Sequence, residues 1–312
     1  MEKELSLKAH YLDFQKRQDT MCVAIRSMLA GLIGLAALPP AAPGFAQAPQ
    51  FDMTKVADNV YSFRFLFWRN MVVLTNDGVI VSDPINPRAA QHMMDEIKKL
   101  SDKPVRLVIY SHNHWDHIAG AKIFKDQGAK VLQHELGAKD TRPHPDVVPA
   151  DETFTGDMHV VSLGGESIEL IHLGPSHGSG MVVMRLPRQR ILHIVDVVTP
   201  ARVAFRSMPD FTPQGMIAAL RKVEQLDFDR ILPGHGPAAA PKSAVTAQRE
   251  YLESLSKAVA DGAKRTGNPW AFDKITEYVK EELQPKYGQW AQFDDYLAMN
   301  VERVILEKNM GW

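Results

Sequence analysis

Cysteine is almost absent from this sequence of 312 residues, since Cys22 is the only one. It lies in an N-terminal segment that we expect to be removed, so the mature chain would contain neither a disulfide nor a thiolate ligand. Structural zinc sites more often use cysteine. Any metal ion would therefore be held by histidine, aspartate, glutamate or water.

An excess of either charge is also lacking, because 36 lysines and arginines face 37 aspartates and glutamates. A nucleic-acid partner would favour a clustered positive face, and no long basic stripe is present. The apolar content of 45% and the charged content of 23% are ordinary for a globular protein. At this length the chain can bury a sizeable core, and neither low-complexity segments nor short repeats interrupt it.

Long apolar runs are missing as well. The run 28–38 is too short to span a bilayer comfortably. With Arg26 before it and Ala46-Gln47-Ala48 after it, it is typical of a secretory signal peptide. We predict a leader and signal peptide over 1–48, cleaved near Ala48, and a periplasmic or secreted protein that meets the membrane only through this segment. Translation from Met21 instead of Met1, and an N-terminal membrane anchor, are the alternatives.

The most informative stretch is His112-Asn113-His114-Trp115-Asp116-His117, which places four potential metal ligands in six positions. It follows the apolar run 105–110, a predicted buried strand, and α/β folds place ligand sites at such strand ends. His112 and His114 are two residues apart and share a face in extended backbone, while Asp116 and His117 can serve a second position. Imidazole and carboxylate suit zinc, and also iron or manganese. The alternative is a solvated loop that binds nothing.

Three further candidates stand where a strand gives way to a loop. They are His177 in Gly174-Pro175-Ser176-His177, Asp196 after the apolar run 191–195, and His235 in Pro233-Gly234-His235-Gly236. Glycines beside these sites let the backbone approach an ion closely.

These four motifs, in this order, resemble the metallo-β-lactamase superfamily over residues 55–240. Asp83 matches the aspartate that ends an early strand in that family. The resemblance implies an α/β fold of the αββα four-layer sandwich type. We expect the catalytic domain over 49–240 and a C-terminal helical extension, 241–312, packed on the same domain.

The resemblance also implies a dinuclear site, most simply with two Zn²⁺ ions, with iron or manganese as alternatives. The first metal would be held by His112, His114 and His177. The second would be held by Asp116, His117 and His235. Asp196 would bridge both metals. Asp116 would also accept and donate the proton. Asp83 would orient a ligating histidine.

The implied function is a hydrolase in which hydroxide formed between the metals attacks the carbonyl of a small ester, lactone, amide or thioester. Alternatives are a β-lactamase, a persulfide dioxygenase-like iron enzyme and a non-enzymatic metal-binding accessory protein. A nuclease is disfavoured by the signal peptide and the missing basic arm.

For the substrate pocket we predict Trp115, Trp68 and Phe205. A strand packed in the core is the alternative for the aromatic hairpin of Phe63, Phe65, Phe67 and Trp68, and a solvated loop is the alternative for Phe205. The apolar positions of the tail would form core or a dimer face.

The remaining pattern predicts the following elements. Strands are expected at 60–63, 65–74, 79–83, 105–110, 129–132, 159–163, 167–173, 181–186, 190–195 and 230–232. Helices are expected at 87–100, 118–127, 214–225, 242–260, 270–283 and 290–309, and irregular loops at 136–156 and 199–212.

Overall fold

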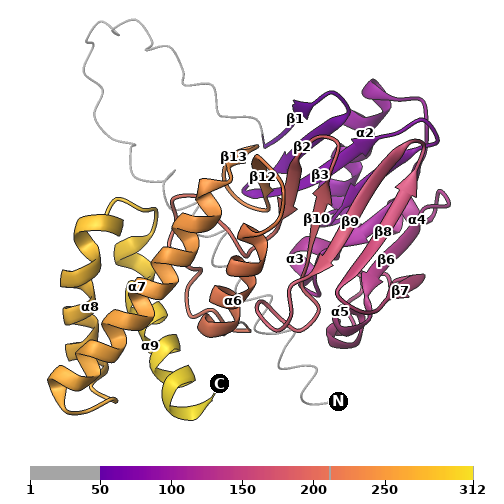
Figure 1. Cartoon of the computed structure of the whole chain (residues 1–312). Coiled ribbons are helices and arrows are strands. Elements are labelled where there is room, and N and C mark those ends of the chain that lie inside the picture. Colours follow the sequence, from indigo (N-terminus) through magenta and orange to yellow (C-terminus); the bar gives the residue numbers. More distant parts are fainter. Residues whose placement is uncertain (1–49, 211, 312) are drawn as a thin grey trace, which may run out of the picture. The chain divides into compact units, whose positions relative to one another are not determined.

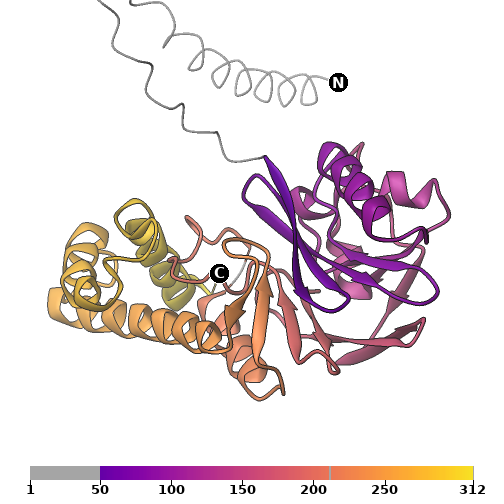
Figure 2. The ribbon, with the colours of Figure 1, turned by 90° about the horizontal axis from the view of Figure 1, so that it is seen from above.

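A computed structural model of the chain describes residues 50–210 and 212–311. The predicted leader and signal peptide over 1–48 lie outside these residues. Two β-sheets occupy the middle of the described part, and helices cover their outer faces (Figures 1 and 2). None of the described helices combines the length and the apolar character needed to cross a membrane.

The first sheet has seven strands in chain order. They are β1 (Phe51–Ala57), β2 (Val60–Phe65), β3 (Trp68–Leu74), β4 (Val79–Ser82), β5 (Val105–Tyr110), β6 (Lys130–His134) and β7 (Glu152–Phe154). Strands β1 to β4 pair antiparallel and β4 to β7 pair parallel. Helices α2 (Pro87–Leu100), α3 (Trp115–Ile118), α4 (Lys122–Lys125) and α5 (Glu135–Asp140) belong to this half of the chain.

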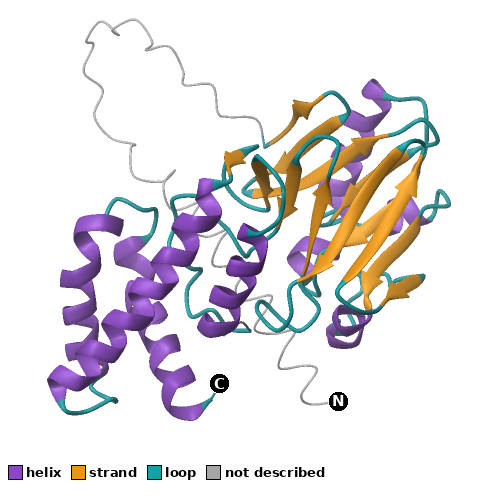
Figure 3. Cartoon of the chain, in the orientation of Figure 1, coloured by secondary structure: helices purple, strands orange, loops and turns teal. Residues whose placement is uncertain are grey.

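The second sheet has six strands, in the spatial order β13 (Ala240–Pro241), β12 (Arg230–Pro233), β11 (Ile191–Ile194), β10 (Val182–Leu186), β9 (Glu166–His172) and β8 (Met158–Leu163). The β11–β12 pair is parallel and is connected through α6 (Pro213–Glu224). Three helices follow, α7 (Ser243–Thr266), α8 (Phe272–Tyr287) and α9 (Phe293–Met310), and Figure 3 shows them grouped at one end of the sheets.

Three apolar cores hold these layers together. The core between the two sheets includes Ile109, Met184 and Leu232. A second core lies between the first sheet and α2 to α4, and a third lies between the second sheet and α6 to α9. The predicted αββα sandwich with additional C-terminal helices is therefore confirmed, and its parallel strand ends meet at one edge.

Helix α2 shows how the local sequence sets these layers. Asn86 accepts a hydrogen bond from the Ala89 amide (2.9 Å), and Pro87 stands in the first turn, where its missing N–H costs nothing. Met93 and Ile97, four residues apart, are buried against the first sheet. The predicted bounds of this helix, 87–100, are confirmed.

Other predicted bounds are wrong. The single helix expected over 118–127 is divided into α3 and α4. At the break, Gly120 lies so close to the Pro84 carbonyl that a Cβ there would approach the carbonyl oxygen to 2.3 Å. The loop expected over 136–156 contains α5 and β7. The side chain of His134 caps α5 at the Leu136 amide (3.2 Å), and β7 forms by pairing with β6. Strand β1 is absent from the predicted elements, since its alternation is weak and its pairing with β2 stabilises it.

The tail helices extend beyond the predicted bounds, and α7 continues to Thr266, where Gly267 ends it at φ +64°. Phe293, Leu297 and Val301 of α9 are buried in the core that α6 and α7 also line. The apolar positions of α9 therefore serve the core of this chain, which is one of the two roles expected for them.

Candidate metal centre

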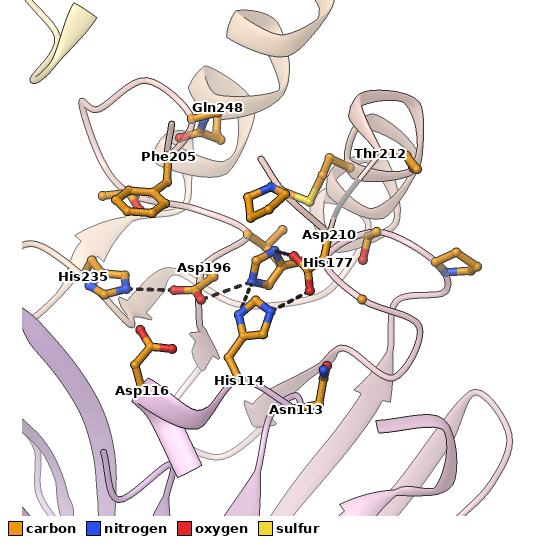
Figure 4. A pocket seen from close by; sticks show the side chains of 18 of the residues that line it. Asn113, His114, Asp116, His177, Asp196, Phe205, Asp210, Thr212, His235 and Gln248 are labelled. Carbon is orange, nitrogen blue, oxygen red and sulfur yellow. Dashed lines mark hydrogen bonds and ion pairs between the residues drawn. The ribbon is translucent and has the colours of Figure 1, made fainter. Parts of the chain in front are cut away.

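The ends of β5, β11 and β12 and the β9–β10 loop converge at one edge of the two sheets. The motif 112–117 follows β5, Asp196 follows β11 and His235 follows β12, while His177 comes from the β9–β10 loop. Figure 4 shows His114, His177, Asp196 and His235 pointing toward one another. The structure thus brings together residues from both halves of the chain.

Two groups of donor atoms arise there. In each group, one ligand atom per residue lies within 4.8 Å of all the others: His112, His114, His177 and Asp196 form the first group, and His117, Asp196 and His235 form the second. Asp196 belongs to both. Its Oδ2 is 3.2 Å from Nε2 of both His117 and His177, and its Oδ1 is 2.9 Å from His235 Nε2. Asp196 is therefore placed to contribute a donor atom to both groups.

The donor atoms fit divalent cations better than they fit one another. His112 Nε2 and both ring nitrogens of His117 are buried and form no hydrogen bond, although Asp196 Oδ2 approaches the two Nε2 atoms to 3.4 and 3.2 Å. A buried polar atom without a hydrogen bond costs about 1–3 kcal/mol, so several such atoms in one place fit a site that binds cations. Nitrogen and carboxylate oxygen donors are suited to zinc, iron and manganese.

Hydrogen bonds on the outer side fix which imidazole nitrogen faces the centre. His112 Nδ1 lies 2.8 Å from Ser111 Oγ, and His235 Nδ1 lies 3.0 Å from the Phe67 carbonyl. Both rings therefore present Nε2 inward. His114 is turned the other way, with Nδ1 3.2 Å from His177 Nε2. Such outer partners set the tautomer and orientation of metal-binding histidines.

Asp210 is the outer partner that the sequence did not reveal. Its Oδ2 is 2.5 Å from His114 Nε2, and its Oδ1 is 3.4 Å from His177 Nδ1 (Figure 4). It lies in the irregular segment before α6, far along the chain from His114. The only local signal is Thr212, which caps α6 by accepting from the Gly215 amide (3.1 Å) and so fixes where this segment ends.

Asp116 lies beside the second group rather than within it. Its Oδ2 is 3.7 Å from His117 Nε2 and accepts a hydrogen bond from Trp68 Nε1 (3.0 Å). Its side chain is 55% exposed. The role of Asp116 as a ligand of the second ion therefore stays a prediction, while its position lets it exchange protons with the cavity.

Asp83 is completely buried behind the centre. Its Oδ1 accepts a hydrogen bond from the Ser111 amide (2.8 Å), and its Oδ2 is 3.9 Å from His193 Nε2. It therefore supports the backbone that leads into the motif, and its predicted role in orienting a ligating histidine stays a prediction. Burial raises the pKa of Asp83 to about 7, although the charge of His117 opposes this.

His193 connects the two sheets. Its Nδ1–H donates to the Leu232 carbonyl (2.8 Å), and its Nε2 lies 2.9 Å from Ser82 Oγ. Burial lowers its pKa to about 4. It is therefore a neutral hydrogen-bonding element behind the centre.

The backbone is strained at two carboxylates of the centre. Asp83 has φ +36° and Asp196 has φ +57°, both in the left-handed region that non-glycine residues avoid. Gly234 lets β12 approach Asp196, because a Cβ at this position would lie 2.7 Å from Val195 Cγ1. Strain of this kind is concentrated at functional sites.

The charges at the centre are strongly coupled. Burial disfavours a charge on Asp196, but the charge of His117 and the contacts of Asp196 Oδ2 with Nε2 of His112, His117 and His177 hold the pKa of Asp196 well below the ordinary value. Burial likewise opposes protonation of His117, yet Asp196 raises its pKa to about 9. Burial lowers the pKa of His112 to about 3. A fixed negative charge at Asp196 is therefore available to cations.

A cavity of about 960 Å³ opens over the centre. Trp115 and Phe205, two of the three predicted pocket residues, line it. Phe67 at the tip of the β2–β3 hairpin lines it too, whereas Phe63 and Phe65 are buried in the core. Trp68 is not among the described residues that line the cavity, and its indole instead supports Asp116. Gln248 and Leu252 of α7 also line this space.

Comparison with known proteins adds a family and a fold. The family model described as "Metallo-beta-lactamase superfamily" matches residues 69–235. A solved structure, the metallo-beta-lactamase from Pontibacter korlensis, aligns with a TM-score of 0.60 at 22% identity, over 65% of this chain and 99% of that one. The likeness of this structure concerns the fold alone.

Two curated relatives match most of the chain. The 2,4-dinitroanisole O-demethylase subunit alpha of Nocardioides sp. (strain JS1661) is 26% identical over 276 residues, 86% of this chain and 84% of its own. The beta subunit from the same strain is 24% identical over 83% of this chain and 82% of its own. Because both matches exceed the length of 69–235, they extend beyond the part that the family model covers.

Proposed function

Because the chain belongs to the metallo-β-lactamase superfamily, we propose that it is a metal-dependent hydrolase of a small molecule, with zinc as the expected metal. The observation that supports this most is the position of Asp196 in both donor groups. A carboxylate shared in this way suits two cations held close together, which is the arrangement of many metallohydrolases.

Two bound cations would lower the pKa of a water molecule at the centre and polarise the bond under attack. The first would be held by His112, His114 and His177, and the second by His117 and His235. Asp196 would hold both in place. The buried nitrogens of His112 and His117 that form no hydrogen bond are the atoms that such cations would satisfy.

Proton transfer is assigned to Asp116 in this proposal. Burial raises the pKa of this carboxyl, but the charge of His117 and the hydrogen bond from Trp68 outweigh burial and lower the pKa below the ordinary value. Asp116 is therefore charged at neutral pH and reaches the cavity. It would accept the proton of the attacking water and deliver it to the leaving group.

The proposed substrates are small esters, lactones, amides or thioesters, which the cavity is large enough to hold. The similarity to two subunits of a 2,4-dinitroanisole O-demethylase supports a second candidate, the cleavage of an activated aryl methyl ether. Both reactions need the same nucleophile, and they differ in the bond that is broken.

The test is metal analysis of the purified chain followed by turnover assays. The panel contains 4-nitrophenyl acetate, a chromogenic lactone, nitrocefin and 2,4-dinitroanisole. We expect turnover of at least one substrate, its loss on chelation and its return when zinc is added. Asp196→Asn should bind less metal and lose most of the turnover. Full turnover after chelation would contradict a metallohydrolase.

We also propose that the protein is exported, on the basis of the apolar run and the small residues that end near Ala48. N-terminal sequencing of the protein from the periplasm or medium should begin close to Pro49. An unprocessed chain in the cytoplasm would contradict export.

A further inference from the structure

One side of the cavity contains a cation without an acidic partner. Arg202 lines the cavity, and none of the ion pairs formed among the described residues includes it. Its Cζ lies 5.6 Å from the ring centre of Phe205 and 5.8 Å from that of Tyr296. Two aromatic rings therefore hold the guanidinium in place. Its Nε is buried and forms no hydrogen bond.

A buried amide lines the same cavity. Gln248 is 5% exposed, and its Oε1 is buried without a hydrogen-bond partner. An amide in this state costs about 1–3 kcal/mol unless a ligand or water satisfies it. If the carboxamide turns by about 180°, its N–H₂ group points where Oε1 now lies and can donate to an oxygen atom of a ligand. In Figure 4, Gln248 and Phe205 lie on the opposite side of Asp196 from Asp116.

The remaining charges of the cavity wall limit what this side can bind. Besides Arg202, the charged lining residues are Arg142 and four aspartates: Asp116, Asp140, Asp196 and Asp210. A substituent with negative charge density is repelled by the aspartates and attracted by the arginines. Arg142 is exposed, whereas Arg202 is half-buried and packs against two aromatic rings. Arg202 is therefore the better-organised anchor.

We propose that Arg202 and Gln248 bind the two coplanar oxygens of a carboxylate or nitro group on an aromatic substrate. The guanidinium fork matches two coplanar oxygens, and the Phe205 ring, which is 55% exposed, offers a surface for the substrate ring. This deepens the proposed hydrolase and rests on it for the position of the reacting bond. Residues 69–235 include Arg202 but not Gln248, so α7 contributes to this recognition from outside the family match.

The test is calorimetric titration of the metal-loaded full chain with benzoate, nitrobenzene and toluene. We expect benzoate to bind at least tenfold more tightly than toluene. Arg202→Met should weaken benzoate binding at least tenfold, and Gln248→Leu should weaken it severalfold. Arg142→Met, the matched control on the same cavity, should change it less than twofold. If the Arg202→Met and Gln248→Leu variants also bind nitrobenzene more weakly, the site accepts nitro groups as well. If only benzoate binding is weakened, the site is specific for carboxylates.

Two results would overturn the proposal. Benzoate affinity that is unchanged in Arg202→Met means that benzoate binds the metals only. Equal losses in Arg142→Met and Arg202→Met mean a general charge effect. If Arg202→Met does not fold, Arg202→Lys replaces it, and it should still bind benzoate severalfold more weakly because the fork is lost.

The binding assay does not depend on turnover. If benzoate binding requires Arg202 but the protein hydrolyses none of the substrates, the proposed subsite is supported and the proposed function is contradicted. If the protein hydrolyses aromatic substrates and Arg202→Met changes the KM of neither charged nor neutral ones, the proposed function is supported and the proposed subsite is contradicted.

Discussion

Replacing Asp210 by asparagine tests whether this carboxylate tunes one half of the metal centre. Its two oxygens lie 2.5 Å from His114 Nε2 and 3.4 Å from His177 Nδ1. Burial raises the pKa of Asp210, but the hydrogen bond from His114 and the charge of His177 hold it below the ordinary value. Asp210 is therefore an anion at neutral pH, and it makes His114 and His177 of the first group better electron donors to a metal ion. An asparagine side chain at this position would keep the shape but present only one acceptor atom.

The size of the effect follows from this geometry. Loss of an outer carboxylate typically lowers metal affinity by about 10- to 100-fold, which corresponds to about 1.4–2.7 kcal/mol. Because Asp210 supports two histidines of one group, we expect the upper part of this range for the first ion. The ion pairs of His117 and His235 within the described residues are made with Asp116 and Asp196 and do not include Asp210. The second ion should therefore be bound as before.

Zinc affinity is measured by competition with a fluorescent chelator, which resolves the two binding steps. Asp210→Asn should weaken one step and leave the other within about twofold. Asp140→Asn is the control, because Asp140 lines the same cavity but accepts a hydrogen bond from Ser179 Oγ instead of from a histidine. Equal weakening of both steps, no weakening at all, or the same loss in Asp140→Asn would refute the reasoning.

Two further predictions concern stability. Burial lowers the pKa of His193 to about 4 in the folded chain, whereas its pKa in the unfolded chain is about 6.5. As the pH falls below about 6.5, the unfolded chain binds a proton at this histidine and the folded chain does not. The free energy of unfolding therefore decreases. Between pH 7 and pH 5 the wild type should lose about 2 kcal/mol more than His193→Gln in urea unfolding, and parallel curves would contradict this. The side chain of Asn300, which is buried, donates to the Ala204 carbonyl (3.1 Å) and the Arg206 carbonyl (2.6 Å) and accepts from Tyr251 Oη (2.7 Å). Asn300→Ala should cost about 2–3 kcal/mol and speed proteolysis within 199–212, whereas unchanged cleavage would show that this segment is held by other contacts.

The parts of the centre that could be predicted are those with local spacing. The six-residue motif from His112 to His117 contains its own strand end, so the positions of its side chains follow from backbone geometry alone. His177, Asp196 and His235 are predictable because each follows an apolar run. In every case a short stretch of sequence includes both the residue and the reason for its position.

Asp210 and Gln248 could not be predicted, because their partners are distant in the sequence. Asp210 lies in a segment without regular structure, and its contact with His114 depends on how α6 packs. Gln248 lies on the buried face of α7, where sequence patterns predict an apolar residue. Helix α5 is also not predictable from its own sequence, since its cap, His134, ends the preceding strand.

The apolar layer between the two sheets lets substitutions that are distant from the metal-binding side chains affect the metal centre. His112, His114 and His117 extend from the first sheet, while Asp196 and His235 extend from the second. The spacing between the two sets of donors is therefore set by the thickness of the apolar layer that separates the sheets. Close-packed interiors transmit a change of even one methylene.

The thickness of the core between the sheets thus sets the distance between the two sets of metal-binding side chains. Shortening Leu232, which is buried in this layer three residues before His235, alters the gap that the donors must bridge. Shortening Met93, which is buried on the outer face of the first sheet, leaves that gap as it is. Two truncations of equal cost to folding would then differ in their cost to metal binding, so natural variation in the intersheet layer is expected to be narrower than on the outer faces.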